Sequence, residues 1–246
     1  MKIILLRHGE SKWNLENRFT GWKDVELTSN GENEALFAAN QLIDNNLKIQ
    51  TVHTSLLKRA TQTAKIVSNI IGFPYNKVQQ DWRLNERHYG ALQGLNKAET
   101  ALQYGEDQVQ LWRRSYDISP PLLSNDDPRN PKFDKKFNSI NTKLPLGESL
   151  KDVIVRLTPF LKTFFSEIKG SDSNHLIVAH SNSLRAIIKV LDNLSEKEIV
   201  SINIPTGVPL VYSLLDNLKV ENKKYLIKSD ELKKKQNIIA NQGKIK

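Results

Sequence analysis

The feature that most constrains the fold is a short apolar run followed by a helical stripe of apolar residues, which occurs near both ends of the chain. Residues 2–6 (KIILL) and 175–179 (HLIVA) are rich in β-branched or aliphatic side chains, as is typical of strands buried on both faces. Strands that alternate with helices form right-handed βαβ units. The sequence therefore predicts a three-layer α/β/α fold with a mostly parallel central sheet.

Periodicity predicts the other elements of this fold. A capping box from Ser29 to Glu32 precedes a helix over about residues 30–45. A strand is expected over 51–55 and another over 208–214, and Pro209 favours an edge position for the second. Apolar stripes predict further helices over 57–71, 150–168 and 184–191.

The remaining segments suggest one domain with two appendages. We expect a single catalytic domain over residues 1–228. Residues 117–147 contain five prolines and little apolar periodicity, so they are either an active-site cover or a surface excursion. Residues 229–246 form a basic tail that is either a solvated end or a cover over the site.

The formal net charge of +9 indicates an anionic ligand. Nucleic acid is disfavoured because the strong charges follow strand ends instead of forming basic stripes with aromatic residues. No apolar run reaches the roughly 18 residues of a membrane span, and the N-terminal run is too short for a secretory segment. With no cysteine, disulfides are excluded. We expect a soluble cytoplasmic protein without a membrane partner.

Two histidines follow predicted strands at their carboxyl ends. His8 comes after the first strand, between Arg7 and Gly9, and His180 follows the strand over 175–179. Ligands of α/β sheets bind beyond the carboxyl ends of the strands. An imidazole there is suited to attack a phosphate, with Arg7 as a planar fork for its oxygens. The motif alone leaves a second interpretation open, a hydrogen-bonded core histidine.

Longer motifs make the chemistry more specific. They are residues 7–11 (RHGES), 19–22 (FTGW), 82–97 (WRLNERHYGALQGLNK), 112–116 (WRRSY), 203–212 (NIPTGVPLVY) and 240–244 (ANQGK). With these motifs the chain resembles the cofactor-dependent phosphoglycerate mutases of the histidine phosphatase superfamily along almost its whole length. The first motif is typical of the superfamily, whereas residues 82–97 and the pair Arg113 and Arg114 resemble the mutases.

The resemblance implies a glycolytic and gluconeogenic isomerase. It would interconvert 3-phosphoglycerate and 2-phosphoglycerate, with 2,3-bisphosphoglycerate as the priming phosphate donor, no metal, and a homo-oligomeric assembly. His8 would be the phosphorylated nucleophile, Glu86 the proton donor and acceptor, and Arg7, Arg59 and His180 would surround the moving phosphoryl group. The substrate-binding residues would be Ser11, Asn14, Thr20, Gly21, Tyr89, Lys97, Arg113, Arg114, Ser181 and Asn182.

Several alternatives stay open at this stage. Glu86 is also explained by a surface pair with Arg87 or Arg83, and Arg113 and Arg114 by an exposed helix face. A phosphatase that uses the same nucleophile with water as acceptor, a bisphosphoglycerate synthase, and a silent phosphate-binding scaffold share much of this pattern.

One position departs from the family. The mutases carry glycine after the second histidine, where this chain has Ser181. Serine would perturb the site, donate a further hydrogen bond, or be harmless if φ is negative there.

Overall fold

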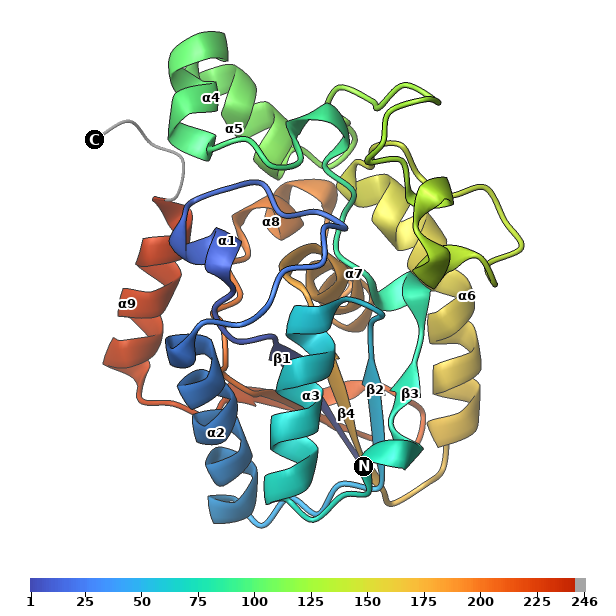
Figure 1. Ribbon diagram of the computed structural model, residues 1–246. Helices are drawn as coiled ribbons and strands as arrows, with labels where there is room; N and C mark the ends of the chain where they lie inside the picture. Colours follow the sequence, from blue (N-terminus) through green and yellow to red (C-terminus); the bar gives the residue numbers. More distant parts are fainter. Residues whose placement is uncertain (242–246) are drawn as a thin grey trace.

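The computed structural model describes residues 1–241, which form a six-stranded mixed sheet between two layers of helices (Figure 1). The strands are β1 (Lys2–Arg7), β2 (Thr51–Thr54), β3 (Gln79–Gln80), β4 (Asn174–Ala179), β5 (Leu210–Leu214) and β6 (Val220–Tyr225). Their order is β3-β2-β4-β1-β5-β6. The first four are mutually parallel, whereas β5 and β6 run antiparallel to their neighbours.

Side chains alternate along β1 between two hydrophobic cores. Ile4 and Leu6 pack with α2 (Ser29–Asp44) and α3 (Lys58–Ile70) on one face of the sheet. Ile3 and Leu5 pack with α6 (Leu150–Ile168), α7 (Ser181–Leu191) and α8 (Glu196–Ser201) on the other. The sequence of β1 is continuously apolar because both faces of the strand are buried. The predicted α/β/α layers and mostly parallel sheet are confirmed.

Smaller helices lie around the carboxyl ends of the parallel strands. They are α1 (Lys12–Leu15), α4 (Lys97–Tyr104) and α5 (Glu106–Arg114). Figure 1 shows α4 and α5 together above the sheet, and α9 (Ser229–Ala240) beside α2. The 3-10 turns are η1 (Tyr75–Lys77), η2 (Trp82–Leu84), η3 (Gly90–Leu92), η4 (Pro131–Phe133) and η5 (Lys135–Phe137).

Two local predictions were wrong. The strand after Pro209 is not at an edge, because β5 pairs with both β1 and β6. Pro209 precedes the strand, so its missing N–H costs no ladder bond. The cap of α2 is Thr28, whose hydroxyl accepts from Gly31 N at 3.0 Å, and not Ser29, which is the first helical residue.

The proline-rich segment 117–147 packs on the loop after α1. Phe137 lies with its ring centroid 4.9 Å from that of Trp22, and Lys136 forms an ion pair with Asp24. Short 3-10 turns, η4 and η5, are the helical elements of the segment. Segment 117–147 thus packs against residues 22–24, which directly follow Thr20 and Gly21.

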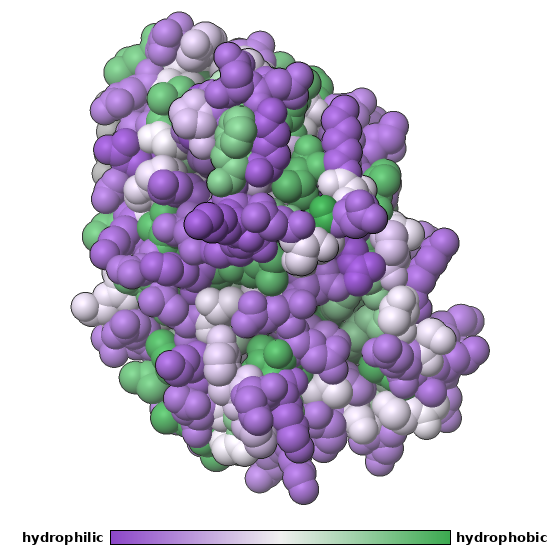
Figure 2. All heavy atoms as spheres, turned by 45° about the vertical axis from the view of Figure 1, so that its right-hand side comes forward, coloured by the Kyte–Doolittle hydropathy of each residue, from purple (hydrophilic) through white to green (hydrophobic). Residues whose placement is uncertain are grey.

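The face that includes α6 is largely hydrophilic, with apolar residues in small separate patches (Figure 2). Within residues 1–241, no helix has the length and apolar character needed to cross a membrane.

Candidate active site

The two predicted histidines meet at the centre of the sheet. β1 and β4 are parallel neighbours in register up to Arg7 and Ala179, and His8 N donates to Ala179 O at 3.0 Å. The residues that follow the two strands therefore emerge side by side. The ring centroids of His8 and His180 are 4.9 Å apart, in an edge-on arrangement.

The contacts of His8 fix its tautomer. Nδ1 lies 2.7 Å from Gly9 O, which can only accept, so Nδ1 carries the proton. Arg59 Nε donates to His8 Nε2 at 3.2 Å, and this requires a lone pair on Nε2. His8 thus presents Nε2 as a nucleophilic nitrogen, and the Arg59 guanidinium lies where an electrophile would approach.

Both histidines are neutral at physiological pH. Burial, followed by the positive charges of Arg59 and Arg7, holds the pKa of His8 well below its usual value. Burial and then Arg59 act on the pKa of His180 in the same direction. A neutral imidazole keeps the lone pair that nucleophilic attack needs.

Arginines beside His8 are anchored by backbone carbonyls. Arg59 donates from Nη2 to Gly21 O at 2.8 Å and from Nη1 to Lys23 O at 3.0 Å. Arg7 donates from Nη1 to Ile204 O at 2.8 Å. Burial lowers the pKa of Arg59 to about 10, so it remains cationic at neutral pH. The two guanidiniums form a fixed anion cradle around Nε2.

Gly9 lies where two backbone segments pack closely together. A Cβ at Gly9 would lie 2.1 Å from Gly31 O, and one at Gly31 would lie 2.0 Å from Glu10 O. The close approach that requires glycine is between the loop after β1 and the first turn of α2. It lets the N-terminal end of α2 pack directly on the segment that carries His8.

Glu86 is buried, so the alternative of a surface pair with Arg83 or Arg87 was wrong. It is 7% exposed and lines the cavity. Its Oε1 accepts from Arg87 N at 2.8 Å and from Asn182 N at 3.1 Å. Among the described residues, both hydrogen bonds to the Glu86 carboxylate go to Oε1, so Oε2 has no donor there.

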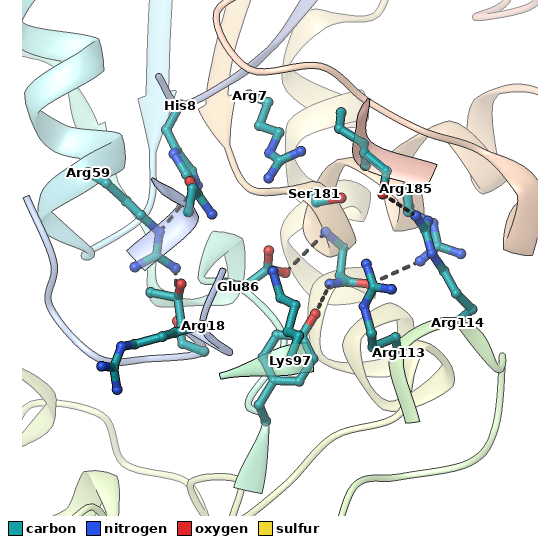
Figure 3. A pocket seen from close by; sticks show the side chains of 16 residues that line it. Arg7, His8, Arg18, Arg59, Glu86, Lys97, Arg113, Arg114, Ser181 and Arg185 are labelled. Carbon is teal, nitrogen blue, oxygen red and sulfur yellow. Dashed lines mark hydrogen bonds between the residues drawn. The ribbon is translucent and has the colours of Figure 1, made fainter. Parts of the chain in front are cut away.

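Figure 3 shows Glu86 between two groups of cations. His8 and Arg59 lie on one side of it, and Arg113, Arg114 and Arg185 lie on the other. Arg114 is held by Asn203 Oδ1 at 2.7 Å, so the helix-face interpretation of the arginine pair was wrong. A ligand that spans the cavity would meet the nucleophile, the carboxylate and the second cation group in that order.

The cavity lining includes most of the predicted site. It consists of Arg7, His8, Asn14, Arg18, Thr20, Gly21, Arg59, Glu86, Tyr89, Lys97, Arg113, Arg114, Ser181, Asn182, Arg185 and Ile239. Seven of these side chains are cationic, and Glu86 is the one carboxylate among this described lining. None comes from segment 117–147, which favours the surface excursion over the cover.

Two predicted residues do not line the cavity. Ser11 caps α1, where its hydroxyl lies 3.0 Å from Asn14 Oδ1, so it holds Asn14 in place. His180 is fully buried behind His8, with Nε2 2.7 Å from Ser55 Oγ.

Three residues of the lining were missed: Arg18, Arg185 and Ile239. Arg185 had a usable signal, because it follows Asn182 by three residues and so shares its helix face. Its Nη1 donates to Asn182 Oδ1 at 3.1 Å. Arg18 and Ile239 had no comparable signal, since one lies on a loop and the other on α9.

Ser181 lies at the first position of α7, and its φ is negative, as in any helix. The condition for a harmless serine is therefore met. In Figure 3 Ser181 lies between Arg7 and Arg185, at the wall of the cavity.

Comparisons with known proteins agree with this site. A family model described as histidine phosphatase superfamily (branch 1) matches residues 3–126 and 123–210. A protein from Bacteroides fragilis named 2,3-bisphosphoglycerate-dependent phosphoglycerate mutase is 50% identical over 247 residues, covering 100% of this chain and 99% of the relative. A protein of the same name from Parabacteroides distasonis is 50% identical, covering 99% of each.

Solved structures show the same fold at lower identity. Mycobacterial hydrolase 1 has a TM-score of 0.70 at 23% identity, covering 92% of this chain and 96% of that chain. A mycobacterial glucosyl-3-phosphoglycerate phosphatase has a TM-score of 0.66 at 24% identity, covering 86% and 92%. With a family match over most of the sequence and the paired histidines at the ends of β1 and β4, the chain belongs to branch 1 of the histidine phosphatase superfamily.

Proposed function

We propose that this protein is a phosphoglycerate mutase that interconverts 3-phosphoglycerate and 2-phosphoglycerate through phosphorylated His8, with 2,3-bisphosphoglycerate as primer. The observation that carries the proposal is the place of Glu86 between the His8 cradle and a second group of cations (Figure 3). A phosphatase needs one phosphate pocket and water. A mutase must also hold the rest of the substrate while a proton moves at the reacting oxygen.

The lining fits the priming compound. 2,3-Bisphosphoglycerate carries two phosphates and a carboxylate, and seven cationic side chains surround a cavity with one carboxylate of its own in the described part of the chain. When bound, it supplies the phosphoryl group that His8 accepts. Arg7 and Arg59 would hold that group, while Lys97, Arg113 and Arg114 would hold the non-reacting phosphate and carboxylate.

The protein's own groups then act in sequence. His8 Nε2 forms a bond to phosphorus as the bond from phosphorus to the substrate oxygen breaks, and Glu86 gives that oxygen its proton. In the reverse step Glu86 takes the proton from the attacking hydroxyl, and phosphorus leaves Nε2. Asn14, Thr20 and Gly21 would add donors for the phosphoryl oxygens, and Tyr89 and Asn182 also line the cavity.

The direct test is interconversion of the two phosphoglycerates, with and without catalytic 2,3-bisphosphoglycerate, in excess chelator. Stimulated and chelator-resistant isomerisation supports the proposal. Release of inorganic phosphate without isomerisation would contradict it in favour of a phosphatase. Loss of activity with the chelator would contradict the metal-free chemistry. Within residues 1–241 no group of His, Cys, Asp and Glu side chains is arranged to hold a metal.

Lys97 should couple substrate binding to proton uptake. Burial, with Arg113 and Arg7 adding to it, lowers the pKa of Lys97 to about 7. The amine is therefore mostly neutral at pH 8, and a bound anion favours its charged form and raises its pKa. We expect net proton uptake when 3-phosphoglycerate binds at pH 8, and affinity that falls by up to about tenfold per pH unit above 7.

Calorimetry in two buffers of different ionisation enthalpy measures this uptake. The phosphate monoester is already doubly ionised at pH 8, so it contributes little. Lys97→Arg is the control, because its guanidinium stays charged and should abolish this part of the uptake. Equal binding enthalpies in both buffers for the native protein would contradict the prediction.

The C-terminal helix should restrict water at the site. Ile239 of α9 lines the cavity, and its carbonyl accepts from Arg114 Nη2 at 3.5 Å. Lys235 joins α9 to Glu34 of α2 at 2.9 Å. Because water hydrolyses a phosphohistidine, removal of residues 233–246 should lower isomerisation and raise the phosphatase fraction. Residues 242–246 of the predicted tail, including part of its 240–244 motif, lie outside the described residues.

Measurement of both rates in one preparation tests this prediction. Lys234→Ala, which changes an exposed side chain of the same helix, is the control and should leave the ratio of phosphatase to mutase activity unchanged. The same ratio after truncation would contradict the role of the tail as a cover.

Three further properties complete the proposal. We place the protein in the cytoplasm and expect a homo-oligomer, in keeping with the resemblance to the mutases. We also propose one catalytic domain over residues 1–228 with the tail as its cover. Light scattering of the purified protein tests the assembly state, and a monomer would contradict it.

A further inference from the structure

Arg156 of α6 lies outside the cavity but grips the backbone beneath Glu86. Its Nη1 donates to Arg83 O at 2.7 Å and to Asn85 O at 3.3 Å. Its Nη2 donates to Asn85 O and to Glu86 O, both at 3.3 Å. Its Nη1 also lies 3.4 Å from Trp82 O, so one guanidinium binds four main-chain carbonyls between residues 82 and 86, in a segment that is not part of the sheet. Arg156 is absent from the cavity lining.

Glu148 holds both Arg156 and the far side of the same segment. Arg156 Nε and Nη2 donate to the two oxygens of Glu148 at 2.6 and 2.9 Å, and both side chains are buried, at 5% and 3% exposed. Glu148 Oε2 also accepts from His88 N at 2.8 Å, and Glu148 N donates to His88 O at 2.8 Å. The backbone is thus tied on both sides of Glu86.

Two tryptophan rings also contact the Arg156 guanidinium. The Arg156 guanidinium lies 5.6 Å from the Trp22 ring centroid and 5.9 Å from that of Trp82. Trp22 Nε1 donates to Glu86 O at 2.6 Å, so this carbonyl has two donors. A buried ion pair is a poor source of net stability, because desolvation offsets much of its attraction. The geometry of the Arg156–Glu148 pair is better explained by the position in which it holds the main chain at Glu86.

We infer that Arg156, oriented by Glu148, is a positioning residue for Glu86. It sets the main chain so that the Glu86 carboxylate stays between the His8 cradle and the second cation group. This inference rests on the proposed function, in which Glu86 moves a proton at the substrate oxygen. A planar fork is needed because four carbonyls and a carboxylate are bound at once, which the compact ammonium of lysine cannot do.

The test uses Arg156→Lys and two reactions that differ in their need for a proton. Phosphoglycerate isomerisation needs Glu86 to protonate an alkoxide. The first-turnover release of nitrophenolate from 4-nitrophenyl phosphate does not, because nitrophenolate leaves as an anion. We expect kcat for isomerisation to fall on the order of 10²-fold with KM little changed, while the nitrophenolate burst keeps its rate.

Arg83→Lys is the matched control, because Arg83 lies on the same segment and pairs with Asp81 near the surface. It should change neither reaction. Trp22→Phe is a second and milder variant, which removes one donor to Glu86 O but keeps an aromatic ring, and it should show the same selective loss. Trp22→Phe also tests the positioning role if Arg156→Lys does not fold.

Three results would overturn the inference. An equal loss in both reactions would show a general structural role, and an unchanged kcat would show that Glu86 needs no such support. A native protein that produces the nitrophenolate burst but no isomerisation would overturn the proposed function, and the positioning role with it.

Discussion

Replacing His8 with alanine is expected to lower isomerisation by at least about 10⁴-fold, because the nucleophile that receives the phosphoryl group is lost. His8 Nε2 is neutral and surrounded by Arg7 and Arg59, and no other cavity-lining residue in the described chain is a histidine. Incubation with labelled 2,3-bisphosphoglycerate measures the effect directly. The native protein should gain acid-labile label, and the variant none.

A matched histidine separates chemistry from folding. His53 is also buried, but it packs edge-on against Phe160 and Phe164 on the α6 side of the sheet. His53→Ala should reduce the thermal midpoint yet leave the labelling intact. Label on the His8→Ala variant would mean that another group is the nucleophile and would remove the basis of the proposed function.

Replacing Glu86 with glutamine should lower kcat for isomerisation by about 10² to 10⁴-fold, the usual range for loss of a general acid and base. Glutamine keeps the size of the side chain and an oxygen that can accept from Arg87 N and Asn182 N. The fold and the binding of phosphoglycerate should therefore persist. Steady-state kinetics together with binding of 3-phosphoglycerate measure both quantities.

A substrate whose leaving group needs no proton provides the control for this prediction. The first-turnover release of nitrophenolate needs no proton from the protein, so Glu86→Gln should retain it. Glu99→Gln, on an exposed position of α4, should behave as the native protein in both reactions. A Glu86→Gln variant with full isomerase activity would assign the proton transfer to another group or to water.

The sequence predicts the parts of the fold that depend on local periodicity. The strand over 175–179 and the helix over 150–168 agree with β4 and α6 because continuous apolar runs and helical stripes follow directly from burial. β6 lacks such a signal, because it is an edge strand whose lysines face solvent. Charged edges limit pairing with other chains, so the same property that protects the strand hides it from pattern analysis.

The site could be predicted where a reactive side chain directly follows a predicted strand. His8 and His180 end strands, and this placed both near the carboxyl edge of the sheet. Their contact depends on β1 and β4 being neighbours, a pairing across more than 170 residues that no local pattern specifies. The support beneath Glu86 was invisible for the same reason, since Arg156 resembles an ordinary surface residue of an amphipathic helix until its partners are known.

The excess of cations around the cavity also has a consequence for folding. Seven cationic side chains face one carboxylate in the described lining, and burial lowers the pKa of several of them. Their mutual repulsion opposes the native state whenever the cavity lacks an anion. An anion at 100 times its dissociation constant adds about 2.7 kcal/mol to the stability of the native state. A phosphorylated ligand bound in the cavity would therefore offset this repulsion, and the folded population would rise with its concentration by mass action. Tight anion binding and high stability of the empty protein oppose each other in this architecture.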